Sequence, residues 1–263
     1  MDEPVIELTG VAKLFDARGV IAKALDEVDL VVRPQRFVAL VGPSGCGKST
    51  VLNLVAGLLD PSAGSVRYRG NPVERPNRRV GYMTQKDTLL PWRSVADNIG
   101  LPLELACRAL GRAERHDRVE QMMELVGLAG FGRHYPSELS GGMRRRAALA
   151  RMLIYEPETL LLDEPFGALD AQLKLVMQQE LARLTHLRQM TVLFVTHDLT
   201  EAIALADEVA VFTRRPGRIR RLCKIDLPQP RDIVSVRFTP DFAGYHDLLW
   251  NELKEEFGTG GDA

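Results

Sequence analysis

The chain has 263 residues, 45% of them hydrophobic, and a formal net charge of −1. This composition supports a sizeable folded core and excludes a global charge bias toward nucleic acid, and no apolar run approaches the ~20 residues of a membrane span. We expect no secretory signal, and the three cysteines, Cys46, Cys107 and Cys223, form no CxxC pair that would indicate a zinc site or a disulfide framework.

The first third of the chain predicts mostly strands. Apolar alternation or continuous apolar runs predict strands at 5–15, 24–32, 36–41, 65–69 and 79–83. The strand at 36–41 is nearly all apolar, as expected of a strand that is covered on both faces. It runs into a glycine-rich segment, and helical periodicity follows at 48–59.

From about residue 88 to 137 the strand signals disappear and helix-like stretches such as 112–126 take their place. We therefore predict a helical subdomain inserted into an α/β core. The core then resumes with helices at 141–155, 170–188 and 199–206 and strands at 159–163, 191–196, 208–213 and 218–225. Such alternation argues for a mainly parallel sheet. In the tail after 225, Thr239-Pro240 resembles a helix start, and apolar residues follow it at helical spacing.

The glycine-rich segment matches the pattern G-x-x-x-x-G-K-S of a phosphate-binding loop in full. Its glycines let the backbone turn and aim N–H groups at phosphate oxygens, and the following helix adds its positive end. We expect Lys48 to contact the β- and γ-phosphates of ATP and the Ser49 hydroxyl to bind Mg²⁺. The predicted loop consists of Gly42, Pro43, Ser44, Gly45, Cys46, Gly47, Lys48, Ser49 and Thr50.

A second apolar strand, 159–163, ends in two acids. Asp163 at its end is placed to join the magnesium shell. Glu164, the next residue, is the candidate general base for the water that attacks the γ-phosphate. A lone Thr-His-Asp follows the strand at 191–196, and His197 therefore lies at the carboxyl end of a strand, where α/β proteins place their sites.

Ser140, Gly141 and Gly142 precede a helical run. Serine is a good N-terminal cap, and two glycines leave the helix end open to an anion. Because one phosphate loop already serves the chain's own nucleotide, this helix end makes most sense opposite the γ-phosphate of a partner's ATP. We interpret Arg144 to Arg146, which follow, as a charged helix face.

Together these motifs resemble the ATP-binding subunit of an ABC transporter over about residues 1–225. The resemblance implies a P-loop NTPase core with a mainly parallel sheet, an N-terminal antiparallel β subdomain and a helical subdomain inserted at about 88–158. Residues 226–263 would then form a short tail with a helix. It also implies ATP and Mg²⁺ as ligands and a head-to-tail homodimer.

Further roles come from the same resemblance. Phe15 would stack on adenine, Gln85 would link magnesium to the helical subdomain, and His197 would act as the switch histidine. The segment 168–170, Ala-Leu-Asp, would contact the other subunit. Met143 departs from the commonest signature, which has glutamine there, while Ser140, Gly141 and Gly142 remain.

Three stretches, 85–92, 196–203 and 214–219, resemble the nitrate/sulfonate/taurine importer group. That implies an integral membrane permease as partner, an extracytoplasmic solute-binding protein acting indirectly, no nucleic acid, and a peripheral location on the cytoplasmic face of the membrane. The alternative is a soluble ABC ATPase acting on nucleic acid or ribosomes. Trp92 is read either as an anchor for the permease or as packing inside the helical subdomain.

Overall fold

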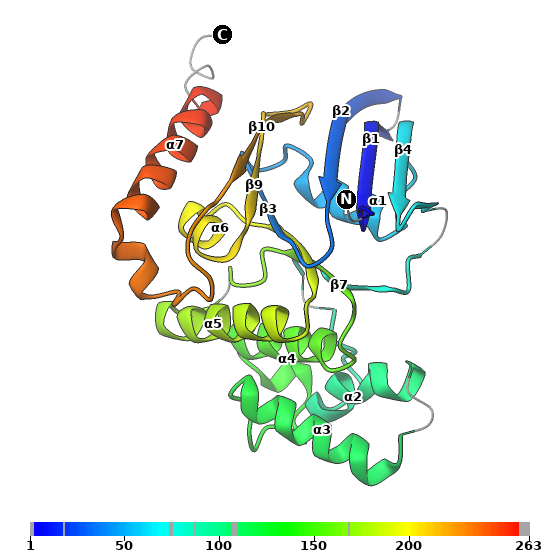
Figure 1. Cartoon of the computed structure of the whole chain (residues 1–263). Helices are drawn as coiled ribbons and strands as arrows, with labels where there is room; N and C mark the ends of the chain where they lie inside the picture. The colour runs from blue at the N-terminus through cyan, green and yellow to red at the C-terminus, as the bar shows by residue number, and fades with distance from the viewer. Residues whose placement is uncertain are drawn as a thin grey trace.

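A computed structural model of the chain describes residues 3–17, 19–73, 76–86, 88–106, 110–167 and 169–257. Its strands form two sheets (Figure 1). The antiparallel sheet has the order β2-β1-β4-β5, with β1 (Ile6–Ala17), β2 (Val20–Val32), β4 (Ala63–Tyr68) and β5 (Asn71–Pro72). The six-stranded sheet has the order β10-β9-β3-β8-β7-β6, with β3 (Phe37–Val41), β6 (Val80–Met83), β7 (Thr159–Asp163), β8 (Thr191–Val195), β9 (Glu208–Phe212) and β10 (Ile219–Lys224).

The strands in the middle of the larger sheet are apolar because both of their faces are covered. Every residue of β3, β7 and β8 is buried. Strands β9, β3, β8, β7 and β6 run parallel, and β10 is antiparallel to β9. Leu40 and Asp163 both pair in register with Val195, so β3, β7 and β8 end at one edge of the sheet. A site is expected at this edge.

Seven α-helices are described, and they cover both faces of the larger sheet. They are α1 (Lys48–Val55), α2 (Val95–Ala106), α3 (Arg112–Leu125), α4 (Gly141–Leu153), α5 (Ala171–Leu187), α6 (Leu199–Leu205) and α7 (Pro240–Phe257), with 3₁₀ turns at η1 (Pro136–Glu138) and η2 (Ser235–Phe238). Helix α1 fills the space between the two sheets, since Leu52 shares one core with Leu8 and Leu30 of the small sheet and Leu40 of the large one.

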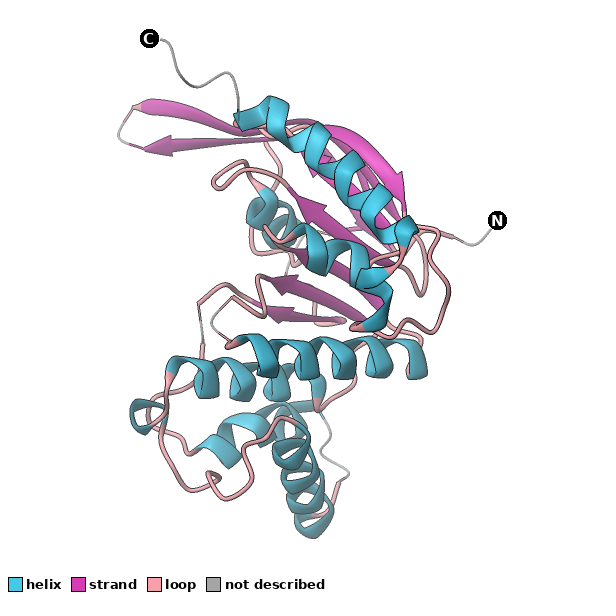
Figure 2. Cartoon of the chain, turned by 90° about the vertical axis from the view of Figure 1, so that its left-hand side faces the viewer, coloured by secondary structure: helices cyan, strands magenta, loops and turns pink. Residues whose placement is uncertain are grey.

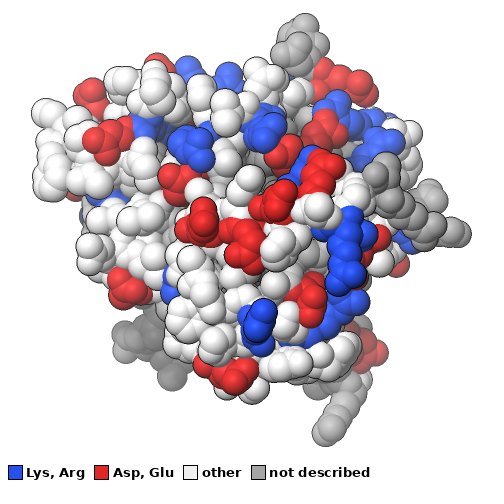
Figure 3. Space-filling view, turned by 90° about the horizontal axis from the view of Figure 1, so that it is seen from below, with Lys and Arg blue, Asp and Glu red and all other residues white. Residues whose placement is uncertain are grey.

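Helices α2, α3 and α4 gather below the sheets in Figure 1, and Figure 2 shows this helical part from the side. Among the described residues of 88–158, the regular elements are α2, α3, α4 and η1, and no strand is described there. The limits of the inserted subdomain, 88 and 158, stay a prediction. From below, the molecule shows Lys and Arg side chains interspersed with Asp and Glu (Figure 3).

The tail helix α7 begins at the predicted Thr239-Pro240 start, where the backbone N–H of Phe242 donates to Thr239 Oγ1 at 3.3 Å. Phe242, Leu249 and Leu253 are buried on its inner face, as the helical spacing predicts. The helix lies along β9 and β10 (Figures 1 and 2), and Arg220 of β10 pairs with Glu252 at 3.0 Å. Among the described helices, none combines the length and apolar character needed to cross a bilayer.

Some predicted boundaries are wrong for local reasons. The helix predicted at 48–59 ends at Val55, because Gly57 takes a left-handed φ of 66° and closes the helix. Strand β2 begins at Val20 rather than residue 24, as its first residues form an exposed two-stranded ribbon with no core to impose alternation. Helix α2 has no predicted counterpart, because its internal Pro102 interrupts the helical pattern.

Candidate functional site

The segment 42–47 forms a turn between β3 and α1 that requires glycine at two crowded positions. Gly47 has a φ of 107°, and a Cβ there would lie 2.6 Å from Leu25 Cδ2 and 2.9 Å from the Ala24 carbonyl oxygen. A Cβ on Gly42 would lie 2.8 Å from the Phe212 carbonyl oxygen. Gly45, also with positive φ, would meet nothing within 4 Å, so its side of the loop is open.

Lys48 begins α1 and turns its side chain back over the loop. Its Nζ donates to the carbonyl oxygens of Gly42 and Pro43, each at 2.8 Å, and lies 3.5 Å from Cys46 Sγ. The lysine is buried. A buried ammonium group needs polar partners, and here the loop itself supplies them.

Asp163 lies buried at the end of β7, next to the start of α1. Burial raises the pKa of the Asp163 carboxyl above its usual value, and the neighbouring Glu164 charge adds to the rise. The hydrogen bond with Ser49 and the positive charges of Arg145 and Lys48 oppose this increase in pKa. The sheet thus brings together the acid and the hydroxyl that the sequence predicts as metal ligands.

These oxygen donors fit Mg²⁺, which prefers oxygen ligands and keeps several positions for water and substrate phosphates. In the described part of the chain, no group of three or more His, Cys, Asp or Glu side chains could hold a metal ion. The Ser49 hydroxyl and the Asp163 carboxylate, which share a hydrogen bond, are the oxygen donors that lie together at this edge of the sheet.

Glu164 is the point where the predicted residues from three segments meet. Its Oε2 accepts a hydrogen bond from Gln85 Nε2 at 3.3 Å, and its Oε1 lies 3.5 Å from His197 Nδ1. Glu164 also has a φ of 48°, in the left-handed region that is costly for a residue other than glycine. Its N–H donates to the Val195 carbonyl of β8 at 2.9 Å, which fixes this turn against the sheet.

His197 is set by the junction between β8 and α6. Asp198 caps α6 by accepting from the N–H of Thr200 at 2.8 Å, and Lys174 of α5 pairs with Asp198 at 2.8 Å. These contacts fix the residue next to His197, whose own side chain remains 65% exposed. An imidazole held beside a carboxylate and open to solvent is placed to contact an incoming ligand.

Residues 140–142, which we call the signature segment, make no contact with the side chains around Glu164 among the hydrogen bonds and ion pairs of the described residues. Ser140 caps α4 by accepting from the Met143 N–H at 3.3 Å, and Ser140 and Gly141 are exposed. Across the described residues, no hydrogen bond or ion pair joins 140–142 to 42–50. The first residues of α4 thus face solvent.

Two predictions stay untested by these contacts. Phe15 is half-buried on β1, opposite Ala22 of β2, with Lys13 Nζ 5.4 Å from its ring centroid. Its stacking on adenine stays a prediction. In the segment expected to contact a second subunit, Ala168 lies outside the described residues, and Asp170 caps α5 by accepting from the Leu173 N–H at 3.0 Å.

One part of the sequence interpretation is wrong. Arg145 does not belong to a charged helix face, because it is only 5% exposed. Its guanidinium is turned inward and donates to the carbonyl oxygens of Asp163 and Glu164, the two residues that we call the acidic cluster. The signal was present in the helical period, which places residue 145 on the same side as the buried Ala148, Leu149 and Met152. Three consecutive arginines hid that signal.

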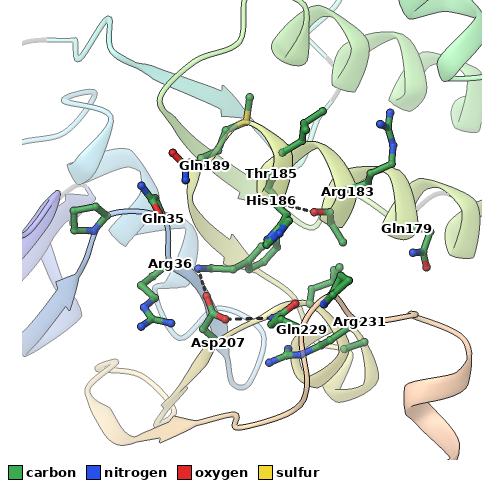
Figure 4. Close-up of a pocket in the computed structure, with 18 of the residues that line it drawn as sticks. Gln35, Arg36, Gln179, Arg183, Thr185, His186, Gln189, Asp207, Gln229 and Arg231 are labelled. Atoms are coloured by element: carbon green, nitrogen blue, oxygen red, sulfur yellow. Dashed lines mark hydrogen bonds between the residues drawn. The ribbon is translucent and has the colours of Figure 1, made fainter.

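A cavity of about 710 Å³ lies at the opposite end of the larger sheet from this cluster (Figure 4). It is lined by residues before β3, the end of α5 and the tail. The Asp207 carboxylate joins two of the lining segments, accepting from the Phe37 N–H at 2.9 Å and from Gln229 Nε2 at 3.5 Å. None of the predicted nucleotide-binding residues lines it.

The two-sheet fold, the loop around Lys48 and the acidic end of β7 define an ATPase of the ATP-binding cassette class. The chain belongs to the ABC transporter family, whose model matches residues 25–167.

Three curated relatives illustrate the family. The chain is 42% identical to an uncharacterized ABC transporter ATP-binding protein of Methanocaldococcus jannaschii, over 95% of this chain and 92% of that protein. It is 39% identical to the aliphatic sulfonates import ATP-binding protein SsuB of Bacillus subtilis, over 92% of each. It is 41% identical to the nitrate import ATP-binding protein NrtC of Synechococcus elongatus, over 89% of this chain and 36% of that protein.

Among solved structures, the dimeric ATP-binding cassette MJ0796 in a post-hydrolysis state bound to ADP and Pi matches with a TM-score of 0.78 and 31% identity. The match covers 85% of this chain and all of that one. The predicted family, fold class and ATPase activity are thereby confirmed. The protein is an ABC ATP-binding subunit that hydrolyses ATP.

Proposed function

We propose that this subunit powers an ABC importer, coupling ATP binding and hydrolysis to the uptake of a small solute of the nitrate, sulfonate or taurine kind through a separate membrane permease. It would lie on the cytoplasmic face of that membrane. The names of the nitrate and sulfonate import relatives support this proposal. The observation that carries it is an exposed tryptophan held rigidly on the segment that follows Gln85.

We assign the site residues as follows. Lys48 and the N–H groups of 42–50 bind the ATP phosphates, and Phe15 supports the adenine. Ser49, Asp163 and Gln85 would hold Mg²⁺, which would neutralise charge on the β- and γ-phosphates. Glu164 takes the proton of the attacking water, and His197, beside it, contacts the γ-phosphate.

We further propose that two copies close head to tail, with Ser140–Gly142 of one facing Lys48 and Ser49 of the other. Two observations support this arrangement: the exposed N-terminal end of α4, and the dimeric state of the cassette with ADP and Pi. Closure around ATP would drive the permease between its two orientations, and hydrolysis would reopen the dimer.

A mixed dimer tests whether residues 140–142 of one copy face the phosphate loop of the other. A Ser140→Arg chain is combined with a Lys48→Ala chain, and nucleotide binding is titrated. In the head-to-tail arrangement both lesions fall in one composite site, so the other site is expected to bind ATP normally. If each signature served its own loop, both sites would be damaged and the mixture would bind as weakly as either parent.

The docking surface for the permease is proposed at the turn before α2. Asn98 is fully buried, and its amide group accepts from the Leu90 N–H at 2.7 Å and donates to the carbonyl oxygens of Leu90, Arg93 and Ser94, each at 3.0 Å. These bonds fix the turn, and Trp92 on it is 72% exposed. The interpretation of Trp92 as a core residue is therefore wrong.

A cavity of about 410 Å³ between the Gln85 segment, α2 and α4 adds a concave apolar surface in the same region. Tyr82, Leu101 and Tyr155 contribute to its walls, and Leu105 at its rim is largely exposed. An exposed aromatic anchor and such a groove, both on the stretch from residue 82 to the end of α2, suit a short helix of a partner protein. The permease is the partner that the importer relatives imply.

Trp92→Ala is expected to leave the melting temperature and the basal ATP turnover of the isolated subunit unchanged and to abolish co-purification with the permease. The exposed ring contributes little to folding, whereas a buried tryptophan would cost ~3–5 kcal/mol on truncation to alanine. Trp250→Ala is the matched control, since Trp250 is also an exposed tryptophan, at 52%, but lies on α7. Co-purification of the Trp92→Ala subunit at the normal level would refute docking at this turn.

A further inference from the structure

Arg145 is the fifth residue of α4, one helical turn after Gly141. Its side chain points away from solvent toward the acidic cluster, and it is only 5% exposed. Burying a guanidinium group is costly unless its N–H groups are bonded. The partners it finds are backbone carbonyl oxygens of the segments that carry the site residues.

One arm of the guanidinium contacts the segment before the helical part. Nη1 of Arg145 donates to the carbonyl oxygens of Thr84 at 2.7 Å and Gln85 at 2.6 Å. Gln85 is the residue whose side chain bonds Glu164. This arm therefore fixes the backbone from which the Gln85 amide group extends.

The other side of the guanidinium contacts the acidic end of β7. Nη2 donates to the carbonyl oxygens of Asp163 at 2.7 Å and Glu164 at 2.6 Å, and Nε donates to that of Pro165 at 3.2 Å. Glu164 has a left-handed backbone conformation, with a φ of 48°. Because such a conformation persists only where its surroundings enforce it, these bonds help to keep the Glu164 carboxylate in place.

We infer that Arg145 is a positioning residue for ATP hydrolysis, whose guanidinium bridges the backbones of Gln85 and Glu164 and ties both to the signature helix α4. The inference rests on the proposed role of Glu164 as the base. Since the N-terminal end of α4 is proposed to meet the partner's ATP, Arg145 links one composite site to the acid of the other. A shift of α4 would then move Gln85 and Glu164 together.

The shape of the guanidinium is what this bridge requires. Its planar fork directs separate nitrogens at two chain segments. A lysine at 145 would keep the positive charge, but its single nitrogen has three donors and cannot replace the five hydrogen bonds that three guanidinium nitrogens make to the 84–85 and 163–165 carbonyls. Charge alone and bridging geometry are therefore separable by substitution.

The test compares Arg145→Lys and Arg145→Met with the parent in the full chain. Both variants are expected to lose kcat by about 10–100-fold, as when a group that orients a reacting residue is removed. ATP affinity, measured with a fluorescent nucleotide, should stay within about twofold, because the phosphate loop is untouched. Arg146→Met is the matched control: Arg146 bonds the carbonyls of Val126 and Gly127 in the helical part, so its loss should lower the melting temperature and spare kcat.

Each other outcome overturns the inference. Near-parental kcat in Arg145→Lys would show that charge, and not the bridge, is what matters. Failure of both Arg145 variants to give folded, ATP-binding protein would assign Arg145 to stability alone. Glu164→Gln is assayed in parallel: if it keeps its turnover, the proposed base is wrong, whereas an inactive Glu164→Gln beside active Arg145 variants rejects only the bridge.

Discussion

Glu164→Gln is expected to bind ATP as the parent does and to lose hydrolysis by about 10²–10⁴-fold, the usual cost of removing a general base. This corresponds to about 3–5 kcal/mol of transition-state stabilisation. The amide has nearly the shape of the carboxylate, so contacts with Gln85 and His197 can persist while proton transfer from water cannot. Phosphate release measures the loss, and size-exclusion chromatography with ATP should show accumulated dimer.

The matched control is Glu158→Gln. Glu158 immediately precedes β7, at the opposite end of the strand from Glu164, and pairs with Arg69. Its neutralisation should leave turnover intact, which separates a role in the site from a general effect of removing an acid near β7. Near-normal turnover in Glu164→Gln would refute the assignment of the base.

Lys48→Ala is expected to fail at an earlier step, the binding of nucleotide. A charge-assisted hydrogen bond from a buried ammonium group contributes about 1.5–3 kcal/mol, so the dissociation constant for ATP should rise by about 10–100-fold. The loop glycines and the α1 N-terminal end would still offer N–H groups, which is why some affinity should remain. Titration with a fluorescent nucleotide measures the change.

Lys224→Ala controls for the loss of any positive charge. Lys224 lies on β10, its side chain is mostly exposed, and it approaches Asp226 only at 3.9 Å. The control should bind ATP like the parent. An unchanged dissociation constant in Lys48→Ala would mean that this loop does not hold the nucleotide.

Much of the fold could be predicted because its signals are local. Strands with a continuous apolar run, such as the three leucines at 160–162, stand out in any sequence, and the strand at 159–163 is found with the predicted limits. The phosphate loop could also be predicted, since its glycine spacing is a sequence pattern. The structure explains that spacing, because a Cβ on Gly47 would clash with Leu25 and one on Gly42 would clash with Phe212. The choice of Gln85 and His197 as site residues came from the family resemblance, and both side chains lie against Glu164.

The rest depends on contacts between distant segments, which leave weak marks in sequence. Arg145 finds its partners some 20 and 60 residues away, and those partners are backbone oxygens, which every residue type offers. No residue pattern can reveal such a pairing. The sequence also leaves two places for Trp92, the core or the surface, for a related reason. Its exposure depends on the amide group of Asn98, which fixes the turn that carries Trp92.

The left-handed backbone at Glu164 also bears on protein engineering. Non-glycine residues in this conformation cost about 1–3 kcal/mol, so glycine at 164 would relax the turn and could raise the melting temperature. It would also remove the carboxylate. With Glu164 as the proposed base, screens for heat tolerance that do not assay turnover would favour inactive enzymes at this position, and useful gains in thermal resistance must come from elsewhere in the chain.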